Sequence, residues 1–466
     1  MPKVKIYQNH ENITLGCVFG AKLSEVLQIN HMHISLPCGG QGGCKKCTVN
    51  VDGHKVLACK FTIEKDVEVQ LNSATNVEIF KTESIKSSKN LGVAVDIGTT
   101  NICAALIDLS NGKILQRVET ANLQSAFGAD VLSRILSSQN SFVQMSAVAK
   151  RQILEIKAMF GVSENLPTVV CANSVISHIF AGVSPEKLGV YPFEMSEFFG
   201  RKIGEDYIVR CISSFIGGDV VCGILSCNML ENKENSLFID IGTNTEIVLK
   251  FDDEIIAASA PAGPAFEGVG LKNGMNAAAG AIKSAKIIDG EIACETVGGV
   301  PAVGICGSGI VDVLAVFREL NLIDENGSIN HETDSKYVTI VGDETCLTLD
   351  NVVITGEDVR QILLAKGAIC AAIDTVLKGE EVEKVYLAGK FGEYLNLMSA
   401  VKIGLFPANF LGKVQIVEDA ALSGATSLLC NEKFKEKSIE IAEKIEVIDL
   451  TSDENFEEKF IENLRF

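Results

Sequence analysis

The sequence has no apolar run long enough to cross a membrane, although apolar residues make up 47% of its 466 residues. It also has no excess of positive charge, because 41 Lys and Arg stand against 60 Asp and Glu, for a net charge of −19. We therefore expect no membrane insertion and no broad binding to nucleic acid. Residues 1–7 alternate polar and apolar side chains and do not follow the basic, then apolar order of a secretory signal, so we expect a cytoplasmic protein.

Histidine is scarce, with six residues, whereas cysteine is abundant, with 15. In a long chain of cytosolic character, this number of cysteines argues against a disulfide framework. Eleven of them are scattered, as Cys103 is, where cysteine is most often a small buried hydrophobe. The other four, which are clustered, are Cys38, Cys44, Cys47 and Cys59.

The four clustered cysteines predict an iron–sulfur site. Cys38, Cys44 and Cys47 come from one ten-residue loop with four glycines, which let the backbone wrap closely and turn N–H groups toward sulfur. Cys59 follows a predicted pair of strands, and we expect the four thiolates to hold a 2Fe–2S cluster. A zinc site is the alternative, but zinc ribbons pair two Cys-x2-Cys knuckles and this chain has one. A loop of thiols without any metal is the other alternative.

Strand and helix patterns divide the chain into several parts. Residues 1–78 are rich in strand patterns, and the polar, Ser- and Lys-rich residues that end at 90 predict a linker over 79–90. Residues 91–235 and 236–450 alternate strand and helix patterns, with helices predicted over 146–159, 308–320 and 357–377, and predict two similar α/β halves. Residues 451–466 then form a C-terminal tail.

A short phrase occurs twice, as Asp-Ile-Gly-Thr-Thr-Asn at residues 96–101 and as Asp-Ile-Gly-Thr-Asn-Thr at residues 240–245. Each copy follows one apolar strand pattern and precedes two more, which indicates an internal repeat. A carboxylate at a strand tip, a glycine turn and a threonine hydroxyl suit a phosphate and its metal ion. One copy alone is explained equally well by a hairpin turn, whereas two copies with the same plan favour nucleotide binding.

The repeat gives the candidate catalytic residues. We expect Asp96 and Asp240 to face each other across a cleft, to hold hydrated Mg²⁺ and to orient the attacking water. Asp219 and Glu246 are further candidates for positioning metal or water, with structural capping as the alternative. The expected phosphate contacts are Gly98, Thr99, Thr100, Asn101, Gly242, Thr243 and Asn244.

Two more glycine-rich segments predict nucleotide contacts. Residues 385–392 are a strand pattern that leads into a turn, and Gly389, Lys390 and Gly392 there suit a close approach of adenosine. Residues 304–309 precede a helix pattern, so Gly307 and Ser308 predict an anion site at a helix N-terminus. A helix start capped by Ser308 is the alternative.

Together these motifs resemble those of the acetate and sugar kinase, heat-shock chaperone and actin superfamily. Within it the chain is similar to the reductive activators of corrinoid-dependent enzymes, through further phrases at residues 122–135, 215–219, 262–268 and 365–368. The resemblance spans nearly the whole chain. It implies an N-terminal β-grasp ferredoxin domain (α+β) followed by a two-lobed, actin-like or RNase H-like α/β ATPase fold.

The resemblance also implies a function. Such activators return a Co(II) corrinoid to Co(I) with one low-potential electron and ATP. The chain would then be an ATP-hydrolysing activase that binds ATP, Mg²⁺ and a 2Fe–2S cluster. Its implied partners are the Co(II) form of a corrinoid protein, a low-potential electron donor and a second copy of itself in a homodimer.

Other functions stay open at this point. Activators of radical dehydratases also couple ATP to electron transfer, but they share a 4Fe–4S cluster, and Cys211, Cys222 and Cys227 lack the spacing for one. An electron carrier whose nucleotide-binding domain does not hydrolyse ATP is a further alternative. A small-molecule kinase would have no use for the cysteine cluster.

Overall fold

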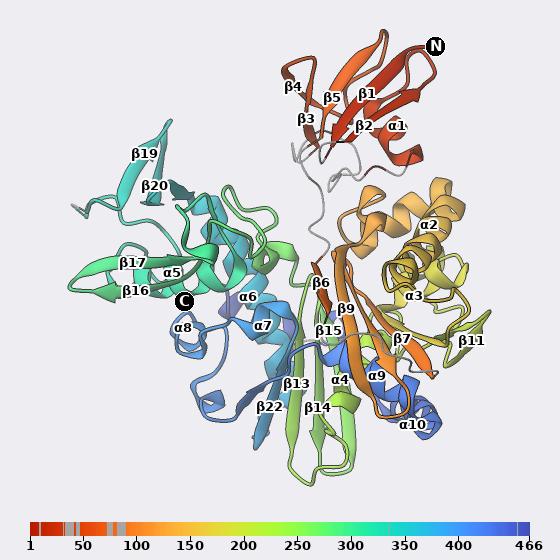
Figure 1. Cartoon of the computed structure of the whole chain (residues 1–466). Helices are drawn as coiled ribbons and strands as arrows, with labels where there is room; N and C mark the ends of the chain where they lie inside the picture. The colour runs from red at the N-terminus through yellow and green to blue at the C-terminus, as the bar shows by residue number, and fades with distance from the viewer. Residues whose placement is uncertain are drawn as a thin grey trace. The chain divides into compact units, whose positions relative to one another are not determined.

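The computed structural model describes residues 1–8, 11–30, 32, 42, 47–71, 78–81, 90–333, 335–453 and 455–466 (Figure 1). Two of the predicted cluster ligands, Cys38 and Cys44, lie outside the described residues. Close contacts divide the chain into two compact units, residues 1–222 with 421–442 and residues 223–420 with 443–466. Within the part that the structure describes, no helix is both long and apolar enough to span a membrane.

The N-terminal residues form a mixed five-stranded sheet with one helix. Its elements are β1 (Lys3–Gln8), β2 (Glu11–Gly16), α1 (Leu23–Ile29), β3 (Thr48–Val51), β4 (His54–Leu57) and β5 (Val67–Gln70). The strand order is β2-β1-β5-β3-β4, in which β1 runs parallel to β5 and the other neighbours are antiparallel. Alternate side chains of β1 and β5 meet Leu23 and Leu27 of α1 in one apolar core. The sheet and helix agree with the β-grasp ferredoxin domain that the resemblance implies, and the ferredoxin identity of this domain stays a prediction.

The first unit contains a seven-stranded sheet in the order β11-β12-β10-β7-β8-β9-β6. Its strands are β6 (Glu78–Lys81), β7 (Leu91–Ile97), β8 (Asn101–Asp108), β9 (Lys113–Ala121), β10 (Thr168–Ala172), β11 (Arg201–Ile203) and β12 (Asp206–Ile208). Strands β7, β8 and β9 form an antiparallel meander, and β10 pairs with β7 in parallel. The near-continuous apolar run of β7 fits a central strand that is covered on both faces.

The second unit contains a six-stranded sheet in the order β23-β22-β13-β14-β15-β24. Its strands are β13 (Ser236–Ile241), β14 (Thr245–Phe251), β15 (Glu254–Ala260), β22 (Lys384–Ala388), β23 (Val414–Ile416) and β24 (Glu446–Val447). Strands β13, β14 and β15 again form an antiparallel meander, and β22 pairs with β13 in parallel. The predicted repeat of strand, turn, strand and strand is confirmed. In each copy the first strand also has a parallel neighbour, which is β10 beside β7 and β22 beside β13.

The second unit also contains two small sheets that the sequence patterns did not predict. Their strands are β16 (Ala281–Ile288), β17 (Glu291–Thr296) and β18 (Gly304–Ile305) in one, and β19 (Val338–Val341), β20 (Glu344–Leu349) and β21 (Val352–Ile354) in the other. Their exposed positions carry apolar as well as charged side chains, as Ile288 and Ile340 show. The alternation of apolar and polar residues that marks a half-buried strand is therefore weak there.

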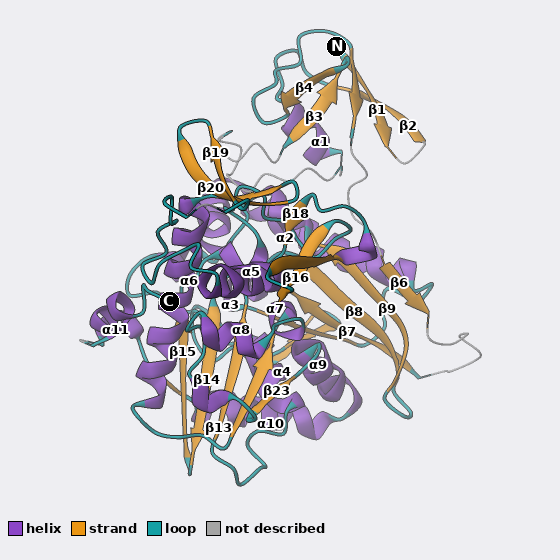
Figure 2. Cartoon of the chain, turned by 90° about the vertical axis from the view of Figure 1, so that its left-hand side faces the viewer, coloured by secondary structure: helices purple, strands orange, loops and turns teal. Residues whose placement is uncertain are grey.

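The helices are α2 (Val131–Met159), α3 (Ser174–Ala181), α4 (Gly218–Ser226), α5 (Gly307–Glu319), α6 (Gly356–Leu377), α7 (Lys390–Glu393), α8 (Leu397–Lys402), α9 (Ala420–Cys430), α10 (Glu432–Lys444) and α11 (Phe456–Glu462). Short 3-10 turns include η1 (Leu123–Ala126), η2 (Glu186–Gly189) and η3 (Pro264–Glu267). Helix α6 packs against β14 and β15 in the second unit (Figure 2).

The predicted start of the first long helix at residue 146 is wrong, because α2 begins at Val131. Asp130 caps this start, and its carboxylate accepts a hydrogen bond from the Ser133 N–H at 2.8 Å. Residues 137–141 are Ser, Ser, Gln, Asn and Ser, and several of these are weak helix formers. The low helix propensity of this segment is the reason that the sequence did not predict the first half of the helix. The predicted helix over 308–320 differs from α5 by one residue at each end, and the predicted helix over 357–377 begins one residue after α6 does.

The boundaries of the two compact units differ from the domain boundaries that the sequence patterns predict. Residues 421–442, which lie inside the predicted range 236–450, cluster with the first unit. Strand β6, at the start of the predicted linker, pairs with β9. In the predicted tail, α11 packs against α6, and the buried Lys366 ammonium donates to the Asn463 carbonyl at 2.9 Å and to the Arg465 carbonyl.

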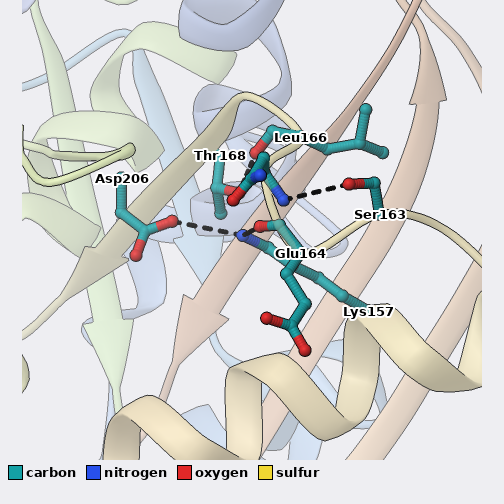
Figure 3. A network of polar contacts seen from close by, with 7 residues as sticks. Lys157, Ser163, Glu164, Leu166, Thr168 and Asp206 are labelled. Carbon is teal, nitrogen blue, oxygen red and sulfur yellow. Dashed lines mark hydrogen bonds and ion pairs between the residues drawn. The ribbon is translucent and has the colours of Figure 1, made fainter.

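A polar network fixes the loop that joins α2 to β10 (Figure 3). The Lys157 ammonium donates to the Glu164 carbonyl at 2.9 Å and lies 3.4 Å from the Asp206 carboxylate. The Lys157 side chain is only 2% exposed. The Thr168 hydroxyl donates to the Leu166 carbonyl at 2.9 Å, at the residue where β10 begins. The network thereby sets the position of β10, the strand that runs toward the first repeated turn.

Lys157→Met should lower the free energy of unfolding by about 1–3 kcal/mol, because the Glu164 carbonyl and the Asp206 carboxylate then lose their charged donor. The matched control is Lys150→Met, on an exposed position of the same helix, which we expect to change stability by less than about 0.5 kcal/mol. Urea denaturation followed by circular dichroism measures both. Equal denaturation midpoints for the two variants would contradict the role of the network.

Candidate functional site

The first repeated turn lies between β7 and β8 and is held by Asn122 and Arg134. The Asn122 side-chain amide donates to the Gly98 carbonyl at 2.8 Å, and its backbone N–H donates to the Thr100 carbonyl at 2.8 Å. The Arg134 guanidinium donates to the Thr99 carbonyl. The C=O and N–H of a trans peptide point in opposite directions, so the N–H groups of Thr99 and Thr100 point away from these two partners. The turn can therefore present the Thr99 N–H to an anion.

Arg134 is a site residue that the sequence patterns did not single out. It is fully buried, and its Nε–H also donates to the Gly128 carbonyl at 3.0 Å. Burial lowers the pKa of Arg134 to about 10, and the charge of Asp130 acts in the opposite direction, so the group stays protonated near neutral pH. Arg134 and Asn122 both lie in the phrase 122–135 that carries the family resemblance. That phrase was the available signal, but it does not show what either side chain contacts.

Asp96 and Asp219 come together in the first unit around the thiol of Cys171. Strand β10 pairs with β7 so that Cys171 lies opposite Asp96, with 3.9 Å between Sγ and the Asp96 Oδ1. Burial raises the pKa of Cys171, as does its contact with Cys222, and the charges of Asp96 and Asp219 raise it further. Burial also raises the pKa of Asp219 to about 6. A cation would relieve this crowding of negative charge.

In the second unit, Asp240 lies directly against the turn predicted to approach adenosine. Asp240 on β13 pairs in register with Ala388 on β22, and Gly389 follows with a φ of 84°. A Cβ atom on Gly389 would lie 2.7 Å from the Asp240 Oδ1 and 2.7 Å from the Ile241 carbonyl oxygen. Lys390 begins α7 at the next residue. The parallel pairing therefore joins the second repeated turn to the predicted nucleotide turn.

The 3-10 turn η3 contacts all three predicted nucleotide elements of the second unit. The Thr243 hydroxyl donates to the Glu267 Oε1 at 2.7 Å. The Phe266 ring packs on Phe391 of α7, with ring centroids 4.8 Å apart. A Cβ atom on Gly307 would lie 1.8 Å from the Phe266 carbonyl oxygen, so the start of α5 packs backbone to backbone against η3. Glu267 and Phe266 belong to the phrase 262–268, but the sequence did not indicate these contacts.

Other predicted residues of the second unit lie nearby. The Gly242 N–H donates to the Asn244 carbonyl at 3.0 Å, which closes the second turn. Glu246 lies opposite Asp240 in the β13–β14 ladder, and the Ser259 hydroxyl donates to its Oε1 at 3.3 Å. Glu246 is therefore held beside the turn by a sheet neighbour.

Three predicted contacts are placed differently. Ser308 is not the cap of α5, because Cys306 takes that position and the Ser308 hydroxyl donates to the Lys283 carbonyl at 3.1 Å. Asn101 begins β8 and pairs with Ala121 in the sheet. Gly392 packs against Leu387, where a Cβ atom would lie 2.8 Å from Cγ. Roles for Ser308, Asn101 and Gly392 in nucleotide binding stay predictions.

Two of the four predicted cluster ligands lie side by side in the N-terminal domain. Cys47 and Cys59 are 1% and 6% exposed, and their Sγ atoms are 3.3 Å apart. A disulfide bond is about 2.05 Å long, so the two thiols are adjacent but not bonded. Among the described residues no group of three or more metal-binding side chains occurs, and Cys38 and Cys44 are not among those residues. Two adjacent, buried sulfur donors are a donor set that fits iron.

Comparison with protein families identifies the larger part of the chain. Residues 91–232 match the RACo middle region, and residues 234–466 match the C-terminal domain of RACo, the ASKHA domain. The chain belongs to the RACo family. The predicted two-lobed α/β ATPase fold and the resemblance to reductive activators of corrinoid-dependent enzymes are both confirmed.

Individual relatives support the RACo assignment. The chain is 26% identical to the corrinoid activation enzyme RamQ of Eubacterium limosum, over 95% of this chain and 96% of that protein. It is 30% identical to the [Co(II) methylated amine-specific corrinoid protein] reductase of Methanosarcina barkeri, over 76% of this chain and 72% of that protein. The solved structure of a reductive activator for corrinoid, iron-sulfur protein matches with a TM-score of 0.72 and 25% identity, over 100% of this chain and 98% of that one.

Within the aligned region, the relative from Eubacterium limosum has more residues than this RACo-family chain. The alignment spans 570 positions, whereas this chain has 466 residues, so that relative contains residues that this chain does not have. The aligned part nevertheless reaches 95% of this chain.

Gly389→Ala should weaken ATP binding by displacing the Asp240 carboxylate. Its control is Gly379→Ala, because Gly379 has nearly the same φ of 86°, but a Cβ atom there would meet no atom of the described residues within 4 Å. Both variants place a Cβ atom at a positive φ, and Gly389→Ala should lose more stability than Gly379→Ala, because φ 84° with ψ 151° is nearly confined to glycine and the Cβ would meet the Ile241 carbonyl oxygen. Only Gly389→Ala should reduce the equilibrium binding of a fluorescent ATP analogue. Equal affinities in the two variants would contradict the close contact with Asp240.

Proposed function

We propose that this RACo-family chain hydrolyses ATP to drive the one-electron reduction of a corrinoid protein from Co(II) to Co(I). The observation that carries the proposal is that one chain joins the RACo ATPase region to a pair of buried, adjacent thiols at Cys47 and Cys59. The names of its relatives, a corrinoid activation enzyme and a Co(II) corrinoid protein reductase, support the same reaction.

ATP would bind at the two repeated turns. In the first unit the Thr99 N–H would supply a donor for phosphate, with Thr100 as a further candidate contact. In the second unit Gly389 and Lys390 would supply contacts for adenosine. Mg²⁺ would be held by Asp96 and Asp240 and would neutralise phosphate charge during hydrolysis. Burial raises the pKa of Asp219 to about 6, and a cation bound near Asp219 would favour its ionised form. Glu246, held beside Asp240, is the corresponding carboxylate in the second unit.

A 2Fe–2S cluster would be held by Cys38, Cys44, Cys47 and Cys59, and would supply a one-electron carrier. Burial of Cys47 and Cys59 keeps water from the sulfur atoms, and exclusion of water is one of the factors that set the reduction potential of such a site. A low-potential donor would deliver the electron to this domain. We further propose that the chain acts as a homodimer.

ATP can drive the reduction only through states that bind the corrinoid protein differently. Axial ligation of cobalt favours Co(II), so Co(I) becomes accessible when the protein environment removes or weakens that ligation. Bound nucleotide can shift the equilibrium between two conformational states of the protein only by the difference between its affinities for those states. Contacts that tie nucleotide elements together, as η3 does in the second unit, are the means by which the bound nucleotide can select one state.

The test combines the reduced protein with a Co(II) corrinoid protein and follows Co(I) absorbance with and without Mg-ATP. Asp240→Asn should keep the cluster spectrum but lower ATP hydrolysis and Co(I) formation by about 100-fold or more, as expected when charge that stabilises a transition state is lost. Cys59→Ser should lose the cluster spectrum and Co(I) formation but keep the basal ATP hydrolysis measured without the corrinoid protein.

The matched control is Asp253→Asn, an exposed carboxylate in the turn between β14 and β15 of the same unit, which should behave as the unmodified protein does. Formation of Co(I) at the normal rate by either Asp240→Asn or Cys59→Ser would contradict the proposed function.

A further inference from the structure

In the second repeated turn, the hydroxyl proton of Thr243 already takes part in a hydrogen bond within the protein. Thr243 lies 2.7 Å from the Glu267 Oε1, and an ionised carboxylate can only accept a hydrogen bond. The Thr243 hydroxyl must therefore be the donor. A threonine hydroxyl has one proton and two acceptor lone pairs, so the Thr243 oxygen can offer a ligand only acceptor capacity.

The equivalent threonine of the first repeated turn has the opposite arrangement. The Asn173 Oδ1 accepts from the Ile176 N–H at 3.0 Å as the N-cap of α3, and this contact fixes which way the amide points. The Asn173 Nδ2 then donates to the Thr99 Oγ1 at 3.2 Å. Among the described residues no acceptor lies within hydrogen-bonding distance of the Thr99 hydroxyl proton, so Thr99 can donate to a ligand.

The two copies of the repeat therefore have opposite hydrogen-bond polarity at the same position. Phosphate oxygens are acceptors and need donors, whereas Mg²⁺ and the hydrogen atoms of its bound water need oxygen lone pairs. We propose that Thr99 donates to a phosphate oxygen of ATP, whereas Thr243, oriented by Glu267, turns its oxygen to Mg²⁺ or to a water of its hydration shell. This division of roles rests on the proposed binding of Mg-ATP.

Glu267 is well suited to act as the positioning residue for Thr243. It ends η3, and η3 is fixed by the Phe266–Phe391 ring contact and by the close backbone packing at Gly307. The Glu267 carboxylate can therefore hold Thr243 in one rotamer. Donation to an anionic oxygen also increases the electron density on the Thr243 oxygen and makes it a better acceptor.

The test measures equilibrium binding of a non-hydrolysable ATP analogue by calorimetry, once with excess Mg²⁺ and once with EDTA. Thr99→Val should weaken binding by about tenfold in both conditions, because a donor to phosphate is lost whether or not metal is present. Thr243→Val should weaken binding by about tenfold with Mg²⁺ and leave it unchanged in EDTA. Thr243→Ser, which keeps the hydroxyl, should restore the Mg²⁺-dependent affinity.

A second comparison tests whether Glu267 acts through Thr243. Glu267→Ala should resemble Thr243→Val, and the double variant should be no weaker than Thr243→Val alone, because the two residues form one unit. Glu267→Gln, whose amide oxygen can still accept the hydroxyl proton, should keep most of the Mg²⁺ dependence. Melting temperatures establish that each variant is folded, and Thr243→Ala replaces Thr243→Val if the latter is not.

Three outcomes would overturn the division of roles. They are equal weakening by Thr243→Val with Mg²⁺ and with EDTA, weakening by Thr99→Val with Mg²⁺ only, and additive losses in the double variant. Failure of the unmodified protein to bind the analogue in either condition is distinguishable from these. It would contradict the proposed ATP-dependent function and with it both threonine roles.

Discussion

The parallel pairing of one strand beside each repeated turn is the constraint on which the candidate site depends. Parallel neighbours end at the same edge of a sheet, so the residues that follow them meet there. In the first unit, β10 pairs with β7 and brings Cys171 and Asn173 to Asp96 and Thr99. In the second unit, β22 pairs with β13 and brings Gly389 to Asp240. Neither site could form if one of these strands were out of register by a residue.

The two copies share this backbone plan but differ in the side chains that surround it. Asn122 and Arg134 hold the carbonyl groups of the first turn, whereas Glu267 engages a side chain of the second. Two copies of the same backbone turn that differ in their neighbouring side chains can present different groups to phosphate and to a metal ion. Such a difference is chemically useful, because Mg-ATP is itself an unsymmetrical ligand with anionic oxygens and a hydrated cation.

The sequence predicted the features that depend on local pattern. The apolar strands around residues 96 and 240 are continuous, and their turns carry Asp and Gly at fixed positions, so the repeat was visible without coordinates. The adjacency of Cys47 and Cys59 agrees with the cluster prediction, which Cys38 and Cys44 leave untested. The first half of α2 was missed because its serines and Asn140 have weak helix propensity, although tertiary packing makes it helical.

Contacts between distant residues could not be predicted in this way. Thr243 and Glu267 are 24 positions apart, and Thr99 and Asn173 are 74 apart, so only the folded sheet brings each pair together. Ser308 is a case in which the local sequence suggested the wrong contact. Its position suited a helix cap, but its hydroxyl donates to the Lys283 carbonyl, which is distant in sequence. Propensity describes the neighbours of a residue in sequence, whereas these roles are decided by its neighbours in space.

We propose that ATP hydrolysis and electron transfer are one coupled reaction of this chain. The most direct measurement follows phosphate release and Co(I) absorbance in the same sample as a Co(II) corrinoid protein is added to the reduced protein with Mg-ATP. Coupling predicts that phosphate release accelerates when the Co(II) protein is added and that Co(I) stops forming when ATP is exhausted. Phosphate release that is unaffected by the corrinoid protein, together with Co(I) formation that continues without ATP, would contradict it.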